Sequence, residues 1–311
     1  MSALAHLPPT ESGGRTVPAA PVRPRSRWLP YLLLAPGLVW LVLFFVLPAL
    51  TLVSTSLQTG SLDTGYVQTF EFGNYTSAWG EYWPQFVRSL VYAGLATLAA
   101  LAIAYPLAYT IAFKAGKYRN LLLVLVIAPF YTSFLLRTLA WKTILADNGI
   151  IVETMQRLGI LDLLSVVGLT TDDRVLATPL AVVTGLTYNF LPFMTLPLYA
   201  SLERLDPRLV EAAEDLYASP FTAFRRVTFP LSLPGVVAGT LLTFIPAAGD
   251  YINAQLLGSL PSTAMIGNVI EALFLRVLDY PRAAALSVTL MVVIVVLVAG
   301  YVRRAGTEEL V

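Results

Sequence analysis

The chain has 311 residues, of which 57% are hydrophobic and 13% are charged, with a net charge of +1. Soluble domains carry about 25% charged residues, so this composition excludes an ordinary soluble protein and predicts an integral membrane protein. The charge balance gives no global attraction to nucleic acid. The chain has no cysteine, which excludes disulfides, and its one histidine, His6, argues against histidine catalysis or a histidine metal site.

The N-terminal region divides into a polar tail and a first apolar span. Residues 1–27 are rich in Pro, Ser, Gly and Arg and predict a disordered tail. They do not resemble a cleaved signal peptide, because no apolar segment lies near the start. No charge occurs between Arg27 and Asp63, and about twenty apolar residues cross a bilayer, so residues 31–56 predict a first transmembrane helix. Residues 28–85 therefore form this helix and an external loop.

Residues 86–304 predict a core of five further transmembrane helices, followed by a short tail, residues 305–311. The expected spans are residues 89–113, 120–145, 175–202, 231–257 and 283–302. Small residues in two of them predict close helix packing: a stripe of Ala96, Ala100, Ala104, Ala108 and Ala112, and the pair Gly235 and Gly239. Residues 147–174 predict one or two short helices at the membrane surface.

The distribution of basic residues predicts the orientation of the chain. With the N-terminus inside, the cytoplasmic segments hold thirteen of the 20 Lys and Arg residues. Cytoplasmic loops carry an excess of these residues, so we expect both termini and the polar loop between the fourth and fifth spans to be cytoplasmic.

This polar loop, residues 203–235, contains two helix-start signals, Asp206-Pro207 and Ser219-Pro220. Each pairs a capping side chain with a proline at the first helical position. We expect two short helices, the second ending at Pro230. On the residues alone, the loop is either a solvated cover or a docking element for a cytoplasmic partner.

The loop resembles the EAA loop of the inner-membrane permease subunits of bacterial ABC importers. The matching residues are Glu211-Ala212-Ala213, Ala218-Ser219, Phe224, Val227, Pro230 and Pro234-Gly235. The resemblance implies an all-α integral membrane fold with six transmembrane helices, the type I importer (MetI-like) permease fold. It also implies that the loop is a coupling helix that docks on an ATP-hydrolysing subunit. The implied docking residues are Glu211, Ala212, Ala213, Leu216, Tyr217, Ala218, Ser219 and Phe224.

Tyr217 departs from the family pattern, which has glycine at this position. Glycine after a helix end adopts positive φ, and a tyrosine there costs on the order of 1 kcal/mol. Either the joint avoids that conformation, or the tyrosine ring serves in the docking interface.

A narrower resemblance is to the spermidine/putrescine permease subunits. It rests on residues 128–133, Leu136-Arg137-Thr138, residues 191–194, residues 197–199, residues 245–250, residues 267–270 and the end of the sixth span. It implies a polyamine pathway shared with a second homologous permease, an extracytoplasmic polyamine-binding protein, two copies of an ATP-binding subunit, and a bacterial inner-membrane location. ATP and Mg²⁺ then bind to the partner ATPase, and this chain holds no cofactor or metal.

Asp250 is the central candidate for a cation pathway, because it lies within an apolar span and an intramembrane carboxylate is expensive. Aromatic faces attract cations as well. The expected path residues are Asp250, Tyr251, Asn253, Gln255, Tyr188, Asn189, Tyr131, Trp141 and Arg137. Alternatively, Asp250 forms a salt bridge with Arg137 or lies near the outer water, and the aromatic residues are ordinary packing.

The sequence lacks the motifs that are typical of other function classes. No P-loop occurs, since Gly116-Lys117 lacks the upstream glycine, so the chain is not its own ATPase and is not an enzyme. Two alternatives stay open. In the first, the chain belongs to an importer of the same class that carries another cargo, such as ferric iron or another organic cation. In the second, the chain is an ATP-independent secondary transporter or channel. The second alternative predicts inverted repeats, which we do not find.

Overall fold

The computed structural model describes residues 29–166, 174–258 and 261–305. The chain divides into two compact units, Met1–Ala49 and Leu50–Val311, and each is described by itself. The predicted disordered tail, residues 1–27, lies outside the described residues, as does nearly all of the predicted tail at residues 305–311.

The first unit is an apolar helical segment. α1 (Leu29–Leu41) continues through the π-helical segment η1 (Val42–Val46) into α2 (Leu47–Ser56), which crosses into the second unit. From Tyr31 to Ser56 the segment is long and apolar enough to cross a membrane, and none of its most apolar window is buried. The predicted first span is confirmed.

The second unit is mainly helical and has a two-stranded antiparallel hairpin near its start. β1 (Gln58–Ser61) pairs with β2 (Gly65–Gln68), with Gln58 opposite Gln68. The helical elements that follow are α3 (Gly73–Tyr109), η2 (Thr110–Lys114), η3 (Gly116–Tyr118), α4 (Arg119–Ile127), η4 (Ala128–Tyr131), α5 (Phe134–Ile144), α6 (Ile150–Arg157), α7 (Ile160–Val166), α8 (Pro179–Glu203), α9 (Pro207–Asp215), α10 (Pro220–Ala223), η5 (Phe224–Thr228), α11 (Phe229–Leu231), α12 (Leu233–Ala248), α13 (Ile252–Leu257), α14 (Ile266–Ala272), η6 (Leu273–Val277) and α15 (Tyr280–Ala305).

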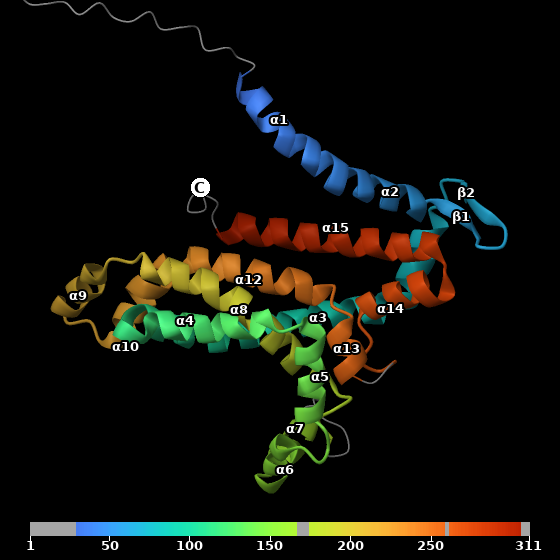
Figure 1. Ribbon diagram of the computed structural model, residues 1–311. Helices are drawn as coiled ribbons and strands as arrows, with labels where there is room; N and C mark the ends of the chain where they lie inside the picture. The colour runs from blue at the N-terminus through green and yellow to red at the C-terminus, as the bar shows by residue number, and fades with distance from the viewer. Residues whose placement is uncertain (1–28, 167–173, 259–260, 306–311) are drawn as a thin grey trace, which may run out of the picture. The chain divides into compact units, whose positions relative to one another are not determined.

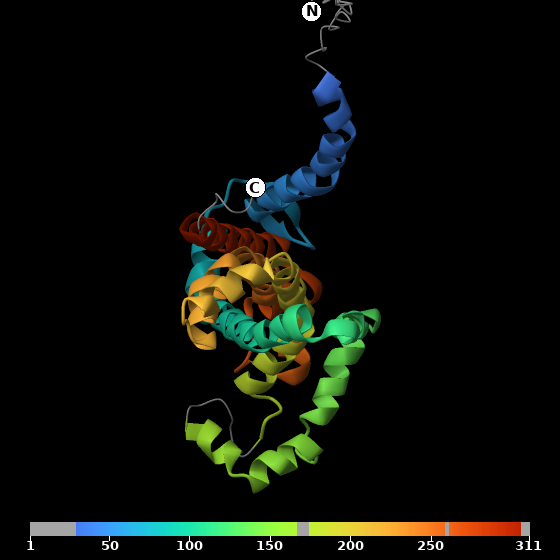
Figure 2. The ribbon, with the colours of Figure 1, turned by 90° about the vertical axis from the view of Figure 1, so that its left-hand side faces the viewer.

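Helices α3, α8 and α12 pack together as the core of the second unit (Figures 1 and 2). The predicted alanine stripe lies in this core, and four of its members are fully buried: Ala96, Ala100, Ala104 and Ala108. A Cβ atom added at Gly235 would lie 2.8 Å from the Pro197 carbonyl oxygen, and one at Gly239 would lie 2.8 Å from Met194 Sδ. The small residues therefore let α12 approach α8 closely, as predicted.

Four helices of the described chain are long and apolar enough to cross a membrane, and the number is six if each of two bent helix pairs counts as one span. The single helices are Tyr31–Ser56, Gly73–Lys114, Pro179–Glu203 and Tyr280–Arg304. The bent pairs are Gly116–Tyr131 with Phe134–Ile144, and Pro220–Leu231 with Leu233–Ala248. The higher number agrees with the six predicted spans.

The third predicted span, residues 120–145, is sharply bent rather than straight. The 3₁₀ segment η4 contains Pro129, and the chain is extended at Thr132 before α5 begins. Proline lacks the N–H that the helix ladder needs, which explains why α4 ends here. α5 then turns 95° away and leads to α6 and α7, the short helices expected between residues 147 and 174 (Figure 1).

The fifth predicted span, residues 231–257, is also interrupted. α12 ends at Ala248, and the helix resumes only at Ile252 as α13. The second helix of the loop ends at Leu231, one residue beyond the predicted end at Pro230, and a 64° bend follows. Pro230 lies inside the continuous helix Pro220–Leu231, and its missing N–H removes a helix hydrogen bond just before the bend.

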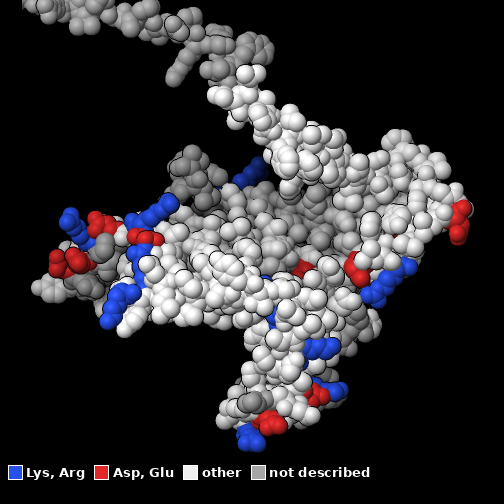
Figure 3. Space-filling model, in the orientation of Figure 1, with Lys and Arg blue, Asp and Glu red and all other residues white. Residues whose placement is uncertain are grey.

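Charged side chains gather at several places on the second unit (Figure 3). One group covers α9 and α10, another covers α6 and α7, and the surface over α4 and α8 between these two groups is largely uncharged. A hydrocarbon layer demands such an uncharged surface, since charge within it is expensive.

Candidate functional site

The first candidate site is the loop predicted to couple the chain to an ATPase, residues 203–235, which holds α9 and α10 and is called the coupling loop below. Asp206 starts α9, and its Oδ1 accepts the N–H of Arg208 at 3.0 Å. Ser219 starts α10, and its Oγ accepts the N–H of Thr222 at 3.3 Å. Both predicted helix starts are confirmed, and each rests on a short polar side chain followed by proline.

The joint between the two helices turns at Tyr217, which has a φ of 59° and therefore lies in the left-handed region. The N–H of Ala218 donates to the carbonyl of Ala213 at 3.1 Å, the hydrogen bond that closes a helix through a left-handed residue. The joint thus takes the conformation that glycine favours. The Tyr217 side chain is 99% exposed, so contacts within the described chain do not offset its steric cost of about 1 kcal/mol.

The exposed side of this joint is apolar. Leu216 is 82% exposed and Phe221 is 72% exposed, on either side of Tyr217. The Glu211 carboxylate is also exposed and has no ion-pair partner among the described residues. Among the other expected docking residues, Ala212 and Ser219 are exposed. Ala213 and Ala218 are half-buried.

Phe224, also expected at the docking surface, is half-buried and faces the core. Its ring meets Tyr105 of α3 edge-on, with 5.6 Å between the centroids, and lies 6.3 Å from the ring of Tyr109. The Tyr105 hydroxyl in turn shares a buried hydrogen bond of 2.7 Å with Ser232 Oγ. Phe224 therefore connects the coupling loop to the core rather than extending its exposed surface.

The second candidate site is centred on Asp250, in the break between α12 and α13. Only 8% of Asp250 is exposed. Its Oδ1 accepts the backbone N–H of Asn253 at 2.8 Å, and its Oδ2 accepts the Asn253 Nδ2–H at 3.2 Å. Within the described residues Asp250 forms no ion pair, so the structure does not contain the alternative salt bridge to Arg137.

Buried polar side chains extend from Asp250 toward α8 and α5. Asn253 Oδ1 accepts from Asn189 Nδ2 at 3.0 Å, and the same Asn189 amide donates to Thr138 Oγ1 at 3.1 Å. Asn253, Asn189 and Thr138 are each at most 1% exposed. These four residues, called the Asp250 cluster below, bring three helices together at one buried polar point.

Close helix approach makes this cluster possible. A Cβ atom added at Gly185 of α8 would lie 2.7 Å from Asn253 Oδ1, so the glycine leaves room for α13.

Thr138 was not among the expected path residues. Its hydroxyl also donates to the carbonyl of Phe134 one turn earlier, which a threonine in any apolar helix can do. Its type and spacing therefore give no signal of a longer-range contact.

The remaining expected path residues divide into two groups. The first group adjoins the cluster: Trp141 and Tyr188 pack edge-on with 5.3 Å between ring centroids, and Arg137, next to Thr138, is buried. The second group is exposed and lies apart from the buried network: Tyr131, which is 90% exposed, Tyr251 and Gln255. The structure thus gathers six of the nine expected residues in and around the cluster.

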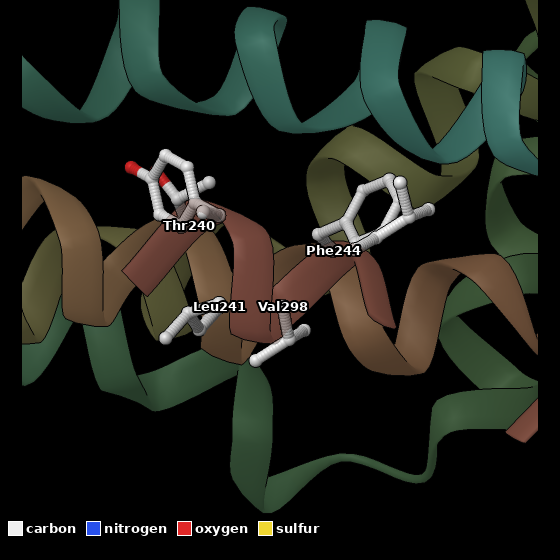
Figure 4. Close-up of a pocket in the computed structure, with 6 residues that line it drawn as sticks. Thr240, Leu241, Phe244 and Val298 are labelled. Carbon is white, nitrogen blue, oxygen red and sulfur yellow. The ribbon is translucent and has the colours of Figure 1, made fainter. Parts of the chain in front are cut away.

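A separate cavity of about 200 Å³ lies between α12 and α15 (Figure 4). Its lining residues are Thr240, Leu241, Phe244, Leu297, Val298 and Tyr301. None of them is charged, so the cavity offers no counter-charge to a cationic ligand.

Among the described residues, no three His, Asp or Glu side chains are grouped to hold a metal ion.

Three kinds of comparison relate the chain to known proteins. Residues 104–305 match the family model described as binding-protein-dependent transport system inner membrane component. The chain is 41% identical over 268 residues to the spermidine/putrescine transport system permease protein PotB of Escherichia coli (strain K12), covering 86% of this chain and 94% of that protein. PotB of Haemophilus influenzae is 39% identical over 265 residues, with 85% and 90% covered.

A solved structure shows the same fold at low identity. The crystal structure of a bacterial ABC transporter that imports the acidic polysaccharide alginate aligns with a TM-score of 0.64 and 17% identity. The alignment covers 91% of this chain and 96% of that chain. At this identity the likeness concerns the fold and not the cargo.

Proposed function

Because this chain belongs to the family of inner membrane components of binding-protein-dependent transport systems, we propose that it forms, with a second homologous permease subunit, the membrane pathway for spermidine or putrescine. An extracytoplasmic polyamine-binding protein supplies the substrate. Two copies of an ATP-binding subunit, which hold ATP and Mg²⁺, drive transport. This chain is the non-catalytic, multi-pass subunit, with both termini and the coupling loop in the cytoplasm.

The observation that carries the proposal is the buried carboxylate of Asp250, which accepts amide hydrogen bonds but forms no ion pair with any described residue. Leaving a buried charge without a counter-charge costs several kcal/mol. The ammonium group of a polyamine supplies that counter-charge. Trp141 and Tyr188 adjoin the cluster and offer the aromatic faces that attract cations. The names of the relatives at 41% and 39% identity support the choice of polyamines as cargo.

The coupling loop supports the second part of the proposal, docking on an ATP-binding subunit. Leu216, Tyr217 and Phe221 expose apolar side chains together, at the end of the unit where charged residues also gather. Exposed apolar patches rimmed by polar residues mark protein interaction sites. The excess of basic residues in this and the other loops assigned to the same side supports a cytoplasmic location.

Replacing Asp250 by asparagine tests the pathway. We expect Asp250→Asn to reduce uptake of labelled spermidine at least about tenfold, because a charge-assisted interaction with an ammonium group is worth roughly 1.5–3 kcal/mol. Asparagine keeps the size of the side chain and an oxygen acceptor. The measurement is uptake by cells that produce the complete transporter from this variant.

The control is Asp63→Asn, the same change in the exposed turn of the hairpin. Assembly of the complex and its ATP hydrolysis should survive both substitutions. Normal spermidine uptake by Asp250→Asn at low substrate concentration removes Asp250 from the pathway. Uptake of a different cation in place of spermidine and putrescine identifies another cargo for the same machinery.

A further inference from the structure

A groove of about 430 Å³ lies between α8 and α12, the two long helices on either side of the coupling loop. These helices pack side by side, next to α9 and α10 (Figure 1). None of the residues that line the groove is among those expected to dock the ATP-binding subunit or to bind the cargo. The proposed function therefore gives this groove no role.

Small residues shape the groove. Gly235 lets α12 touch α8, because a Cβ atom added there would lie 2.5 Å from Ser201 Cβ. Beside this contact, Ala200 of α8 and Ala238 of α12 line the groove with single methyl groups. Short side chains on both helices thus leave an open channel next to the point where the helices meet.

The groove runs along α8 from the end of the helix toward its interior. Pro197, Ser201 and Arg204 line it and lie on one face, because residues three and four positions apart are neighbours on a helix. The stretch from Pro197 to Arg204 corresponds to roughly 10 Å along the helix axis. The lining therefore changes over this length from a guanidinium through a hydroxyl to an apolar ring.

The charge of the groove is positive. Of the described residues that line it, Arg204 alone is charged. Arg204 is exposed and forms no ion pair with any described residue. The neighbouring carboxylate of Glu203 does not neutralise it, because Glu203 pairs with Arg119 of α4. An unpaired guanidinium attracts an anionic ligand and repels a polyamine, so the groove does not suit the cargo.

The position of the groove indicates the kind of anion. Both α8 and α12 belong to segments that are long and apolar enough to cross a membrane. Arg204 lies at the end of one such segment, the depth at which lipid headgroups meet the hydrocarbon layer. Basic pockets between membrane helices on the cytoplasmic side bind anionic headgroups. A phospholipid matches both ends of the groove, since its phosphate is anionic and its acyl chains are apolar.

We propose that this groove binds one anionic phospholipid of the cytoplasmic leaflet. The phosphate accepts hydrogen bonds from the Arg204 guanidinium and the Ser201 hydroxyl, and an acyl chain begins along Pro197 and Ala238. The lipid contacts both helices that flank the coupling loop, so its binding stabilises their packing. The choice of leaflet rests on the proposed function, in which the coupling loop is cytoplasmic.

A photoreactive phosphatidylglycerol tests the proposal in the complete transporter, embedded in phosphatidylcholine membranes. The concentration that gives half-maximal labelling of residues 197–205 measures the affinity. We expect Arg204→Gln to raise this concentration about tenfold, because it removes a charge-assisted hydrogen bond to the phosphate. Ala200→Phe keeps every charge but fills the groove with a ring, and we expect it to raise the concentration several-fold.

Arg304→Gln is the matched control, because it removes an exposed arginine from the end of α15, outside the groove. It should leave the labelling unchanged. A photoreactive phosphatidylcholine should label the groove more weakly than phosphatidylglycerol does, because its headgroup has no net charge. Excess inorganic phosphate should not displace the lipid, because it has no acyl chain to occupy the apolar end.

Unchanged labelling of either Arg204→Gln or Ala200→Phe overturns the proposal. Equal labelling by phosphatidylcholine, or displacement by inorganic phosphate, also overturns it. Absence of labelling in the complete transporter overturns it as well, because another subunit then covers the groove. Ala200→Phe and the headgroup comparison decide if Arg204→Gln does not assemble. The Asp250→Asn uptake measurement judges the proposed pathway separately, since lipid labelling requires no polyamine.

Discussion

The two candidate sites depart from the usual distribution of polar and apolar groups in opposite ways. The Asp250 cluster buries a carboxylate and two asparagine side chains among apolar helices. The coupling loop exposes Leu216, Tyr217 and Phe221. A buried charge lacks a counter-charge, whereas an exposed apolar patch lacks a cover. The difference is consistent with the two ligands proposed above, a small cation at the cluster and a protein surface at the loop.

Reversing the charge of Glu211 tests the protein-binding side of this comparison and has the largest expected effect. We expect Glu211→Lys to abolish copurification of the ATP-binding subunit and to reduce uptake more than about tenfold, because a like-charge contact in an interface costs several kcal/mol. Binding of spermidine to the permease subunits should not change. Asp63→Lys, the same change in the exposed hairpin turn, is the control. Retained copurification together with retained uptake contradicts docking at Glu211.

Truncating Asn253 tests the buried side. Asn253→Ala keeps the backbone N–H bond to Asp250 Oδ1 but removes the side-chain hydrogen bond to Asp250 Oδ2 and the acceptor for Asn189. A buried polar group left unsatisfied costs about 1–3 kcal/mol, so the midpoint of thermal unfolding of the purified transporter should fall. Copurification of the ATP-binding subunit should persist. Gln255→Ala, an exposed position two residues later, should leave the midpoint unchanged. Equal midpoints for the two variants are incompatible with the hydrogen bonds described here.

Replacing Tyr217 by glycine has the smallest expected effect and separates stability from docking. Glycine adopts positive φ without steric cost, so Tyr217→Gly should stabilise the loop by about 1 kcal/mol. The same change removes an exposed ring, so affinity for the ATP-binding subunit should fall. Thermal unfolding and titration with that subunit measure the two quantities. A rise in both shows that the tyrosine ring does not contribute to docking.

Local features of the chain were predictable from sequence because their causes are local. Apolar stretches of sufficient length predict the spans, and Asp206 and Ser219 predict the helix starts at the coupling loop. The 95° turn before α5 was not predictable, since Pro129 indicates a break in the helix but not the direction of the next one. Asn189 was expected in the pathway, but its contact with Thr138 was not predictable, because a contact between residues 51 positions apart depends on how the helices pack.

The length of helix α3 allows it to connect two distant parts of the second unit. Its 37 residues correspond to roughly 55 Å, against a hydrocarbon layer of about 30 Å. Near one end Tyr105 touches Phe224 of the coupling loop. Near the middle of the helix, Arg88 Nη1 donates to the carbonyl of Ala264 at 2.8 Å, and Ser89 Oγ accepts the N–H of Ile266 at 2.7 Å. One helix therefore joins the loop to the start of α14, and we expect a displacement at one of these two contacts to move the other.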